Sequence, residues 1–204
     1  MLIIDMQNDF LHTDGWLAHR AKALPDGAMD MPFLMDTIPQ VRRLADAFRS
    51  AQLPVVYVVT ARRSDNSDAQ VPFWRPGFYG GGNRTFVAEG SWGARIVDDL
   101  EPREGEHVVI KKGYGGFSNT PLDTILRNIG VTTCVVAGVT TCVCVSTTIR
   151  GGVEHNYRMI LVGDAVAEVS RDTHEAELRT MARIFADVKT TDEVIATLAD
   201  ISRG

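Results

Sequence analysis

Three residues in this sequence could together carry out nucleophilic catalysis. Asp5 lies near the end of the first apolar run, Lys111 ends the run HVVIK, and Cys144 lies just beyond CVVAGV, where a helix should begin. A thiolate is a strong nucleophile, a carboxylate could take up the thiol proton, and a nearby ammonium favours the thiolate. Backbone amides at a helix start would add an oxyanion hole. This combination predicts cleavage of an amide through a thioester.

Each of these residues also has a purely structural interpretation. Asp5 could cap a turn, Lys111 and Lys112 could form a solvated pair, and cysteines are often small buried hydrophobes. Cys142 and Cys144 form a Cys-x-Cys pair, but the other cysteine falls inside an apolar run and no histidine cluster lies close in sequence, which argues against zinc. The occurrence of an acid, a base and a thiol at three strand ends favours catalysis.

Six short apolar runs are predicted to be the strands that position these residues. They are Leu2–Met6, Val55–Thr60, His107–Lys111, Cys134–Val139, Met159–Val162 and Val188–Thr191. Helical patterns alternate with these runs, so we expect a three-layer α/β/α fold with a mostly parallel, Rossmann-like six-stranded sheet. The carboxyl ends of parallel strands lie at one edge of such a sheet, where ligands bind.

Five helices are predicted from apolar spacing and terminal residues. The first begins with Thr37 as its N-cap, and the second has Thr120 as N-cap and Pro121 at its first position. The third begins after Cys144, the fourth at Ser170 or Arg171, and the fifth after Thr191. Segments 11–35 and 61–95 show no clear periodicity, and we expect long functional loops there. No linker composition is visible, so residues 1–204 are predicted to form one domain. The first run begins at residue 2, which is abrupt for a central strand and leaves a longer native N-terminus open.

Composition excludes several classes of protein. The chain has 204 residues, of which 45% are hydrophobic, and a net charge of −5, which gives no electrostatic footprint for nucleic acid. No apolar run is long enough for a membrane span, and no signal peptide is visible. Three cysteines are too few for a disulfide scaffold, and their odd number leaves a free thiol, so the cytoplasm is the expected location.

Longer motifs surround the three candidate residues. Residues 5–10 read DMQNDF, residues 111–120 read KKGYGGFSNT, and residues 138–145 read GVTTCVCV. The segment EGSWGARIVDDLEP at 89–102 and the pair Asp164-Ala165 belong to the same pattern. In order and spacing, these motifs resemble the isochorismatase-like cysteine hydrolases over nearly the whole chain.

The resemblance implies a role for each member of a catalytic triad. Cys144, rather than either of the other cysteines, would be the nucleophile, and Asp5 would be the general acid and base. Lys111, rather than Lys112, would complete the triad. Lys112 departs from the proline that often follows the catalytic lysine in this family.

The resemblance also implies features of the backbone and of the assembly. An unusual cis peptide bond would precede Thr140, and the amides of Thr140 and Cys144 would form the oxyanion hole. No cofactor is expected. Members of the family commonly form homo-oligomers, so a dimer or a tetramer is predicted.

Two departures narrow the expected activity. The stretch TARRSDNSDAQ contains no histidine, whereas the metal-dependent nicotinamidases of the family carry Asp-x-His there, so no metal is expected. Isochorismatases that cleave a vinyl ether do not keep the nucleophilic cysteine, whereas Cys144 is present here. The run TTCVCVSTT looks most like ureidoacrylate, N-carbamoylsarcosine and biuret hydrolases. We therefore expect hydrolysis of a C–N bond in a small amide or ureido compound, with release of ammonia or carbamate.

Aromatic and basic residues in the loops are the predicted substrate contacts. They are Phe10, Trp74, Arg75, Trp92, Tyr114 and Phe117, with Trp16, Arg62 and Arg63 as further candidates. Arginine would suit a carboxylate on the substrate, although the aromatic residues could instead anchor loops or fill a subunit interface. Two alternative functions stay open: a vinyl ether hydrolase of the isochorismatase type, and a non-catalytic binding or redox protein that uses Cys142 and Cys144.

Overall fold

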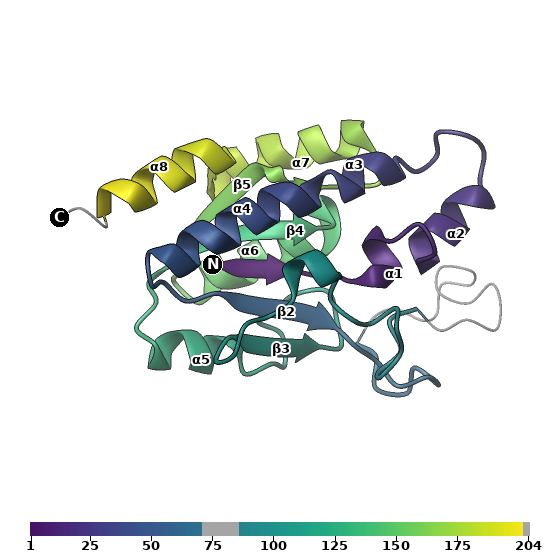
Figure 1. The fold of residues 1–204 in the computed structure, drawn as a ribbon, viewed down its shortest axis with the longest axis horizontal. Coiled ribbons are helices and arrows are strands. Elements are labelled where there is room, and N and C mark those ends of the chain that lie inside the picture. The colour runs from purple at the N-terminus through teal and green to yellow at the C-terminus, as the bar shows by residue number, and fades with distance from the viewer. Residues whose placement is uncertain (71–85, 202–204) are drawn as a thin grey trace.

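A computed structural model of the chain describes residues 1–70 and 86–201 (Figure 1). Its strands are β1 (Leu2–Ile4), β2 (Val56–Thr60), β3 (His107–Lys111), β4 (Thr133–Val139), β5 (Arg158–Ala167) and β6 (Asp187–Lys189). They form one sheet in the order β3-β2-β1-β4-β5-β6, and every pairing between these strands is parallel. The predicted α/β fold is confirmed, and the described sheet is entirely parallel rather than mostly so.

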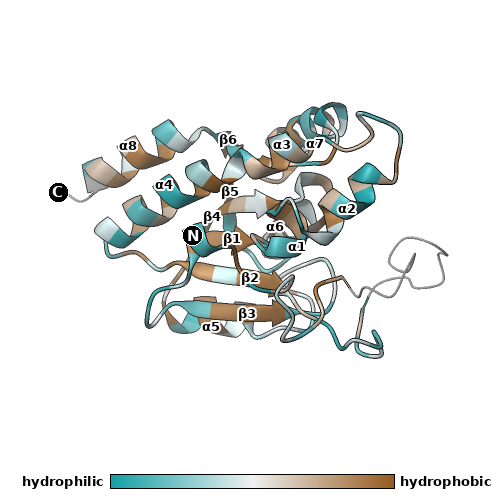
Figure 2. Cartoon of the chain, turned by 45° about the vertical axis from the view of Figure 1, so that its right-hand side comes forward, coloured by the Kyte–Doolittle hydropathy of each residue, from teal (hydrophilic) through white to brown (hydrophobic). Residues whose placement is uncertain are grey.

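Helices cover both faces of this sheet. One layer contains α3 (Met31–Met35), α4 (Thr37–Ser50) and α8 (Thr191–Ile201), whose buried side chains share a core with Ile3 of β1. The other layer contains α5 (Leu122–Asn128), α6 (Ser146–Glu154) and α7 (Arg171–Ile184), which share a second core with Leu2 and Ile4. Alternate residues of each central strand therefore enter different cores, which explains their continuous apolar sequences. Figure 2 shows these hydrophobic strands between helices with polar outer faces.

Several boundaries differ from the sequence prediction. β1 ends at Ile4 because Asp5 has a φ of +48°, which turns the chain away from the sheet. β5 runs on to Ala167, since it continues to pair with β4 beyond a register shift between Val136 and Gly138. The segment 11–35, expected as loop, contains two whole helices, α2 (Trp16–Lys22) and α3, and begins at the last residue of α1 (Asn8–Leu11). Short helical stretches of this kind carry too few turns to show a clear period.

The helix termini also test the sequence prediction. α7 begins at Arg171, one of the two expected starts, and Ser170 caps it by accepting a hydrogen bond from the amide of Thr173. Thr37, the expected N-cap of α4, is instead its first residue, and its hydroxyl donates to the carbonyl of Leu34 at 2.6 Å. In α6, Gly152 packs so closely on β5 that a Cβ there would lie 2.5 Å from Met159 Sδ. Among the described residues, no helix has the length and hydropathy that crossing a membrane would require.

Candidate active site

The carboxyl ends of β1, β3 and β4 bring the three predicted catalytic residues together. Lys111 Nζ lies 2.8 Å from Asp5 Oδ2 and 3.4 Å from Cys144 Sγ. The Asp5 and Lys111 side chains have no exposed surface, and Cys144 is 6% exposed. Residues that are 106 and 33 positions apart in sequence thus form one buried cluster around the ammonium group.

A fourth side chain, Thr60, completes this cluster and was missed in the sequence. Its hydroxyl accepts a hydrogen bond from Lys111 Nζ at 2.6 Å and donates one to Asp5 Oδ1 at 3.0 Å. Thr60 is the last residue of β2 and pairs directly with Lys111 in the sheet register. A polar residue that ends an apolar strand, next to the strand that carries Lys111, was the available signal.

The rest of the DMQNDF motif holds this cluster in position. The Gln7 side chain donates hydrogen bonds to the carbonyls of Thr60 and Ala94, and accepts one from the amide of Thr60. Asp9 accepts hydrogen bonds from the amides of Trp16 and Val87. Gln7 therefore fixes the end of β2 against β1, and Asp9 fixes two segments that contribute to the adjacent cavity.

The segment that carries Cys144 leaves β4 through an unusual backbone. Gly138 has a φ of +120°, and a Cβ there would lie 2.1 Å from the carbonyl oxygen of Ile4, so only glycine fits. The following peptide bond, Val139–Thr140, is cis, as the resemblance predicted. The Thr140 carbonyl then accepts hydrogen bonds from the amides of Val143 and Val145, on either side of the cysteine.

A short π-helix follows this turn and leads into α6. It covers Thr141–Val145 and contains Cys144. The hydroxyl of Thr148, one turn further on, donates to the Cys144 carbonyl at 2.7 Å and accepts from the amide of Gly116 at 2.9 Å. Thr148 thus ties the segment that carries Cys144 to the loop that follows β3.

The charges around Cys144 decide its protonation state. Burial and the Asp5 carboxylate raise the pKa of the Cys144 thiol, and Lys111 only partly opposes them. Burial alone would lower the pKa of Lys111, but the negative charge of Asp5 and the hydrogen bonds to Asp5 and Cys144 outweigh it, and the pKa is raised. The resting site therefore holds an ammonium group at Lys111 and a protonated thiol at Cys144.

The other two cysteines lie outside this cluster. Cys134 is buried within β4, where burial raises its pKa to about 11. Cys142 is half-buried, its Sγ donates to the Thr173 carbonyl, and burial together with Glu168 raises its pKa to about 12. All three cysteines are free thiols.

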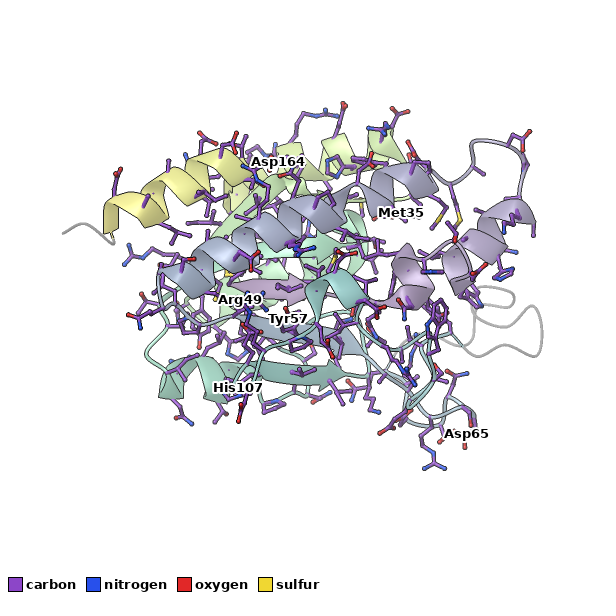
Figure 3. All side chains as sticks on the ribbon, in the orientation of Figure 1. Met35, Arg49, Tyr57, Asp65, His107 and Asp164 are labelled. Carbon is purple, nitrogen blue, oxygen red and sulfur yellow. The ribbon has the colours of Figure 1, made fainter. Side chains whose placement is uncertain are left out.

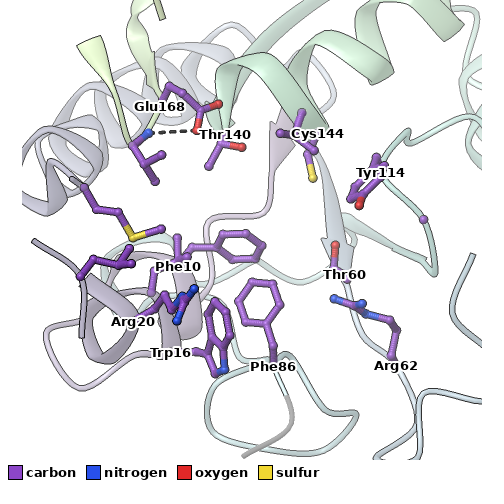
Figure 4. A pocket seen from close by; sticks show the side chains of 16 residues that line it. Phe10, Trp16, Arg20, Thr60, Arg62, Phe86, Tyr114, Thr140, Cys144 and Glu168 are labelled. Carbon is purple, nitrogen blue, oxygen red and sulfur yellow. Dashed lines mark hydrogen bonds between the residues drawn. The ribbon is translucent and has the colours of Figure 1, made fainter. Parts of the chain in front are cut away.

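A cavity of about 330 Å³ opens onto Cys144 (Figure 4). Thr60 and Thr140 also border it, so the cavity reaches both the Lys111 cluster and the start of the segment that carries Cys144. Its aromatic wall contains Phe10, Trp16, Phe86 and Tyr114, with Phe86 4.8 Å from the rings of both Phe10 and Trp16. Charged residues at its edge are Arg20, Arg62 and Glu168.

The predicted substrate contacts divide into three groups. Phe10 and Tyr114 line the cavity, as do the further candidates Trp16 and Arg62. Trp74 and Arg75 lie outside the described residues. Trp92, Phe117 and Arg63 are not among the lining residues.

These three side chains make other contacts. The ring of Trp92, which is 40% exposed, lies 4.9 Å from that of His12. Phe117 is buried in the core under α5 and α6, with its ring centroid 5.6 Å from that of Tyr157. Arg63 points to solvent and lies 3.5 Å from Asp65. Sequence proximity to Lys111 placed Phe117 in the site, whereas its side chain turns inward.

Arg20, Phe86 and Glu168 are among the cavity residues that were missed in the sequence. Arg20 lies on α2, which the sequence did not predict, and Glu168 follows a β5 strand that runs five residues longer than expected. Within the described residues, no group of three or more His, Cys, Asp or Glu side chains is arranged to hold a metal ion.

Comparison with known proteins agrees with the fold and the motifs. The Isochorismatase domain family model matches residues 1–193. The chain belongs to this family. Ureidoacrylate amidohydrolase RutB from Methylobacterium radiotolerans is 30% identical over 91% of this chain and 73% of its own length.

Solved structures of family members extend this agreement. A cysteine hydrolase from Pseudomonas syringae pv. phaseolicola has a TM-score of 0.83 and 31% identity, over 98% of this chain and 91% of its own. The N-carbamoylsarcosine amidase from Thermoplasma acidophilum has a TM-score of 0.74 and 30% identity, over 94% and 95% of the two chains. The resemblance inferred from the sequence motifs is confirmed, and the protein is an isochorismatase-like hydrolase.

Proposed function

We propose that the protein is a cysteine-dependent amidohydrolase that cleaves a C–N bond of a small amide or ureido compound and releases ammonia or carbamate. The observation that carries this proposal is the contact of Lys111 Nζ with Asp5, Thr60 and Cys144 in a buried cluster that opens onto a cavity. The names of the relatives, ureidoacrylate amidohydrolase and N-carbamoylsarcosine amidase, support a C–N bond as the target.

The raised pKa of Cys144 determines how the first step proceeds. The thiol keeps its proton at neutral pH, so a base must remove that proton as the sulfur attacks. Asp5 is that base in our proposal, since its carboxylate interacts with the Cys144 thiol and is held in place by hydrogen bonds from Lys111 and Thr60. The Lys111 ammonium stabilises negative charge on both sulfur and carboxylate during this transfer.

The amides of Thr140 and Cys144 form the oxyanion hole in this mechanism. As the tetrahedral intermediate collapses, the C–N bond breaks, and the proton held by Asp5 passes to the departing nitrogen. Asp5 then takes a proton from water, which attacks the thioester, and the acid product leaves with Cys144 reprotonated. Preorganised donors of this kind contribute about 3 kcal/mol to transition-state stabilisation.

Arg62 and the aromatic wall are the proposed substrate contacts. Arg62 is 3% exposed, and its guanidinium lies 5.7 Å from the centre of the Phe86 ring. Its backbone is fixed by a hydrogen bond from its amide to the Val87 carbonyl and by another from the Glu89 amide to its own carbonyl. A guanidinium held in this way suits a carboxylate carried by the substrate, as proposed for the loop arginines.

An ammonia-release screen tests the proposed reaction. The panel contains ureides, carbamoyl amino acids, maleamate, nicotinamide and isochorismate, each with wild type, Cys144→Ala and Cys142→Ala. We expect release from an amide or ureide, a loss of at least about 10⁴-fold in Cys144→Ala, and activity near wild type in Cys142→Ala. Isochorismate cleavage that survives in Cys144→Ala would instead favour vinyl ether hydrolysis.

Mass spectrometry on a trapped intermediate tests the nucleophile itself. With the substrate identified in the screen, rapid acid quenching should leave an acyl group on Cys144. An adduct on Cys142 or Cys134, with Cys144 unmodified, would contradict the assignment. Reversible oxidation of Cys142 and Cys144 without turnover on any compound would favour a redox protein.

A further inference from the structure

Glu168 brings a buried carboxylate to the cavity that the mechanism above does not use. It follows the last residue of β5, and since Ala167 pairs with Val139, Glu168 lies beside Thr140 at the carboxyl edge of the sheet. The residue is 6% exposed and lines the same cavity as Cys144. Figure 4 shows Glu168 next to Thr140, at the end of the pocket away from Arg62.

The hydrogen bonds of Glu168 leave part of its accepting capacity unused. Oε2 accepts from the amide of Cys142 at 2.9 Å, and Oε1 accepts from the amide of Val169 at 2.9 Å. Each carboxylate oxygen can accept about two hydrogen bonds, so the two amides and the neighbouring Cys142 thiol leave roughly one further position. In residues 1–70 and 86–201, no arginine or lysine side chain forms an ion pair with this carboxylate.

A buried carboxylate at a cavity wall selects its ligand by charge. Burial of a carboxylate is costly unless donors or cations compensate for the lost water, and two backbone amides compensate only in part. A ligand N–H group that points at Glu168 would complete that compensation. A ligand carboxylate in the same position would be repelled by it.

We propose that Glu168 is a specificity-determining residue that binds an N–H group of the substrate. This inference rests on the function proposed above and sharpens its substrate class. The preferred substrate is a primary amide or ureide that presents an N–H donor next to the scissile carbonyl, with any anionic group directed toward Arg62. Because Glu168 also holds the Cys142 amide, it couples recognition of that nitrogen to the turn that carries Cys144.

Two alkylating agents of nearly equal size test this preference without any turnover. Iodoacetamide carries a primary amide, whereas iodoacetate carries a carboxylate. Their rates of reaction with Cys144, followed by mass spectrometry of the peptide that contains it, give a selectivity ratio that we divide by the same ratio for free glutathione. We expect Glu168→Gln to lower this corrected ratio about tenfold, as loss of one charge-assisted hydrogen bond predicts.

Matched variants separate recognition from structural damage. A disturbed turn would slow both reagents together and leave the ratio unchanged, and that result would overturn the proposal. Glu175→Gln removes one charge from an exposed position on α7 and should keep the wild-type ratio. Glu168→Asp keeps the charge but withdraws it by one methylene, so it should also lower the ratio. A wild-type ratio in Glu168→Asp would contradict direct contact.

The alkylation experiment also separates this inference from the proposed function. If the ammonia-release screen finds no substrate but the ratio falls in Glu168→Gln, the proposed activity fails and the recognition by Glu168 stands. If turnover is found but the ratio does not move, the activity stands and the role of Glu168 is refuted. Thermal unfolding of each variant shows that the folded protein is being compared.

Discussion

Two ion pairs, one fully and one mostly buried, lie at opposite ends of β2 and β3. At the carboxyl end, Lys111 of β3 pairs with Asp5 and contacts the hydroxyl of Thr60 on β2. At the amino end, Glu106 just before β3 pairs with Arg49 of α4, which contacts the hydroxyl of Tyr57 on β2. Figure 3 labels Arg49 and Tyr57 at this second site.

The two pairs differ in what remains unsatisfied. Arg49 donates to both carboxylate oxygens of Glu106 at 2.8 Å and to Tyr57 Oη at 3.1 Å, so these groups satisfy one another. Lys111 Nζ instead also donates a hydrogen bond to the titratable thiol of Cys144, which lies beside the cavity. A buried ion pair is structural when its members satisfy one another. It becomes chemically useful when one member also holds a reactive group that a ligand can reach.

Removal of the cation from each pair gives the largest expected contrast. Lys111→Met should lower kcat/KM about 10³-fold, since both the thiolate and the Asp5 carboxylate lose their counter-charge. Arg49→Met should leave kcat/KM within about twofold of wild type. Ammonia release from the substrate found in the screen measures kcat/KM of both variants. A comparable loss of kcat/KM in the two variants would show that the ion pairs do not differ in their importance for activity.

The free energy of unfolding should fall in Arg49→Met, although the activity of this variant should stay near that of wild type. Arg49→Met leaves the mostly buried Glu106 carboxylate without its partner, which should reduce the free energy of unfolding by about 1.5 kcal/mol, between the values for exposed and fully buried pairs. The double variant Arg49→Met with Glu106→Leu should recover most of that loss, because no unpaired charge remains. Urea denaturation of the four members of this cycle measures the coupling. Additive losses in the double variant would show that the pair is not coupled.

The two hydroxyl groups provide a smaller and matched test. Thr60→Val removes the group that bridges Lys111 and Asp5, and should lower kcat about tenfold, as loss of hydrogen bonds to charged partners predicts. Tyr57→Phe removes the corresponding hydroxyl at Arg49 and should leave kcat unchanged. Equal kcat values for Thr60→Val and wild type would show that Thr60 only fills space.

The smallest expected difference between the two ion pairs is in how their contribution to stability depends on pH. Burial alone would raise the pKa of Glu106, but Arg49 outweighs it and holds the pKa below its ordinary value of 4.5. The pair therefore stabilises the fold fully above pH 4.5, and this contribution is lost as the pH falls through the lowered pKa. For Lys111, whose pKa is raised above 10.5, the stabilising contribution is fully present below pH 10.5 and is lost only as the pH rises through the raised pKa. The melting temperature should therefore change less between pH 3 and pH 7 in Glu106→Gln than in wild type, as measured by thermal unfolding.

The part of the fold set by local sequence could be predicted well. Strands that are buried on both faces have continuous apolar sequences, so five of the six predicted runs overlap the observed strands over most of their length, and β6 begins one residue earlier and ends two residues earlier. Asp5, Lys111 and Cys144 could be grouped because parallel strands end at a common edge. Their family motifs then singled out Cys144 among the three cysteines.

The rest depends on side-chain direction and on long-range packing. Thr60 joins the cluster only because β2 and β3 pair in one particular register. Phe117 and Tyr114 are three residues apart, yet one enters the core and the other the cavity. Glu168 reaches the site because β5 continues past Gly163 and Asp164, residues that interrupt the apolar run. None of these side-chain positions can be recognised from a short window of sequence.

The order of the strands has a consequence for the making of the protein. β1 is synthesised first but lies between β2 and β4 in the finished sheet. Lys111 follows Asp5 by 106 residues, and Cys144 follows Lys111 by another 33. At about 5–20 residues per second, the ribosome needs roughly 7 to 30 seconds between the first and last of these residues. A chain that stops short of β4 therefore carries Asp5 and Lys111 without Cys144, and the buried cluster can assemble only after the ribosome has passed the codon for Cys144.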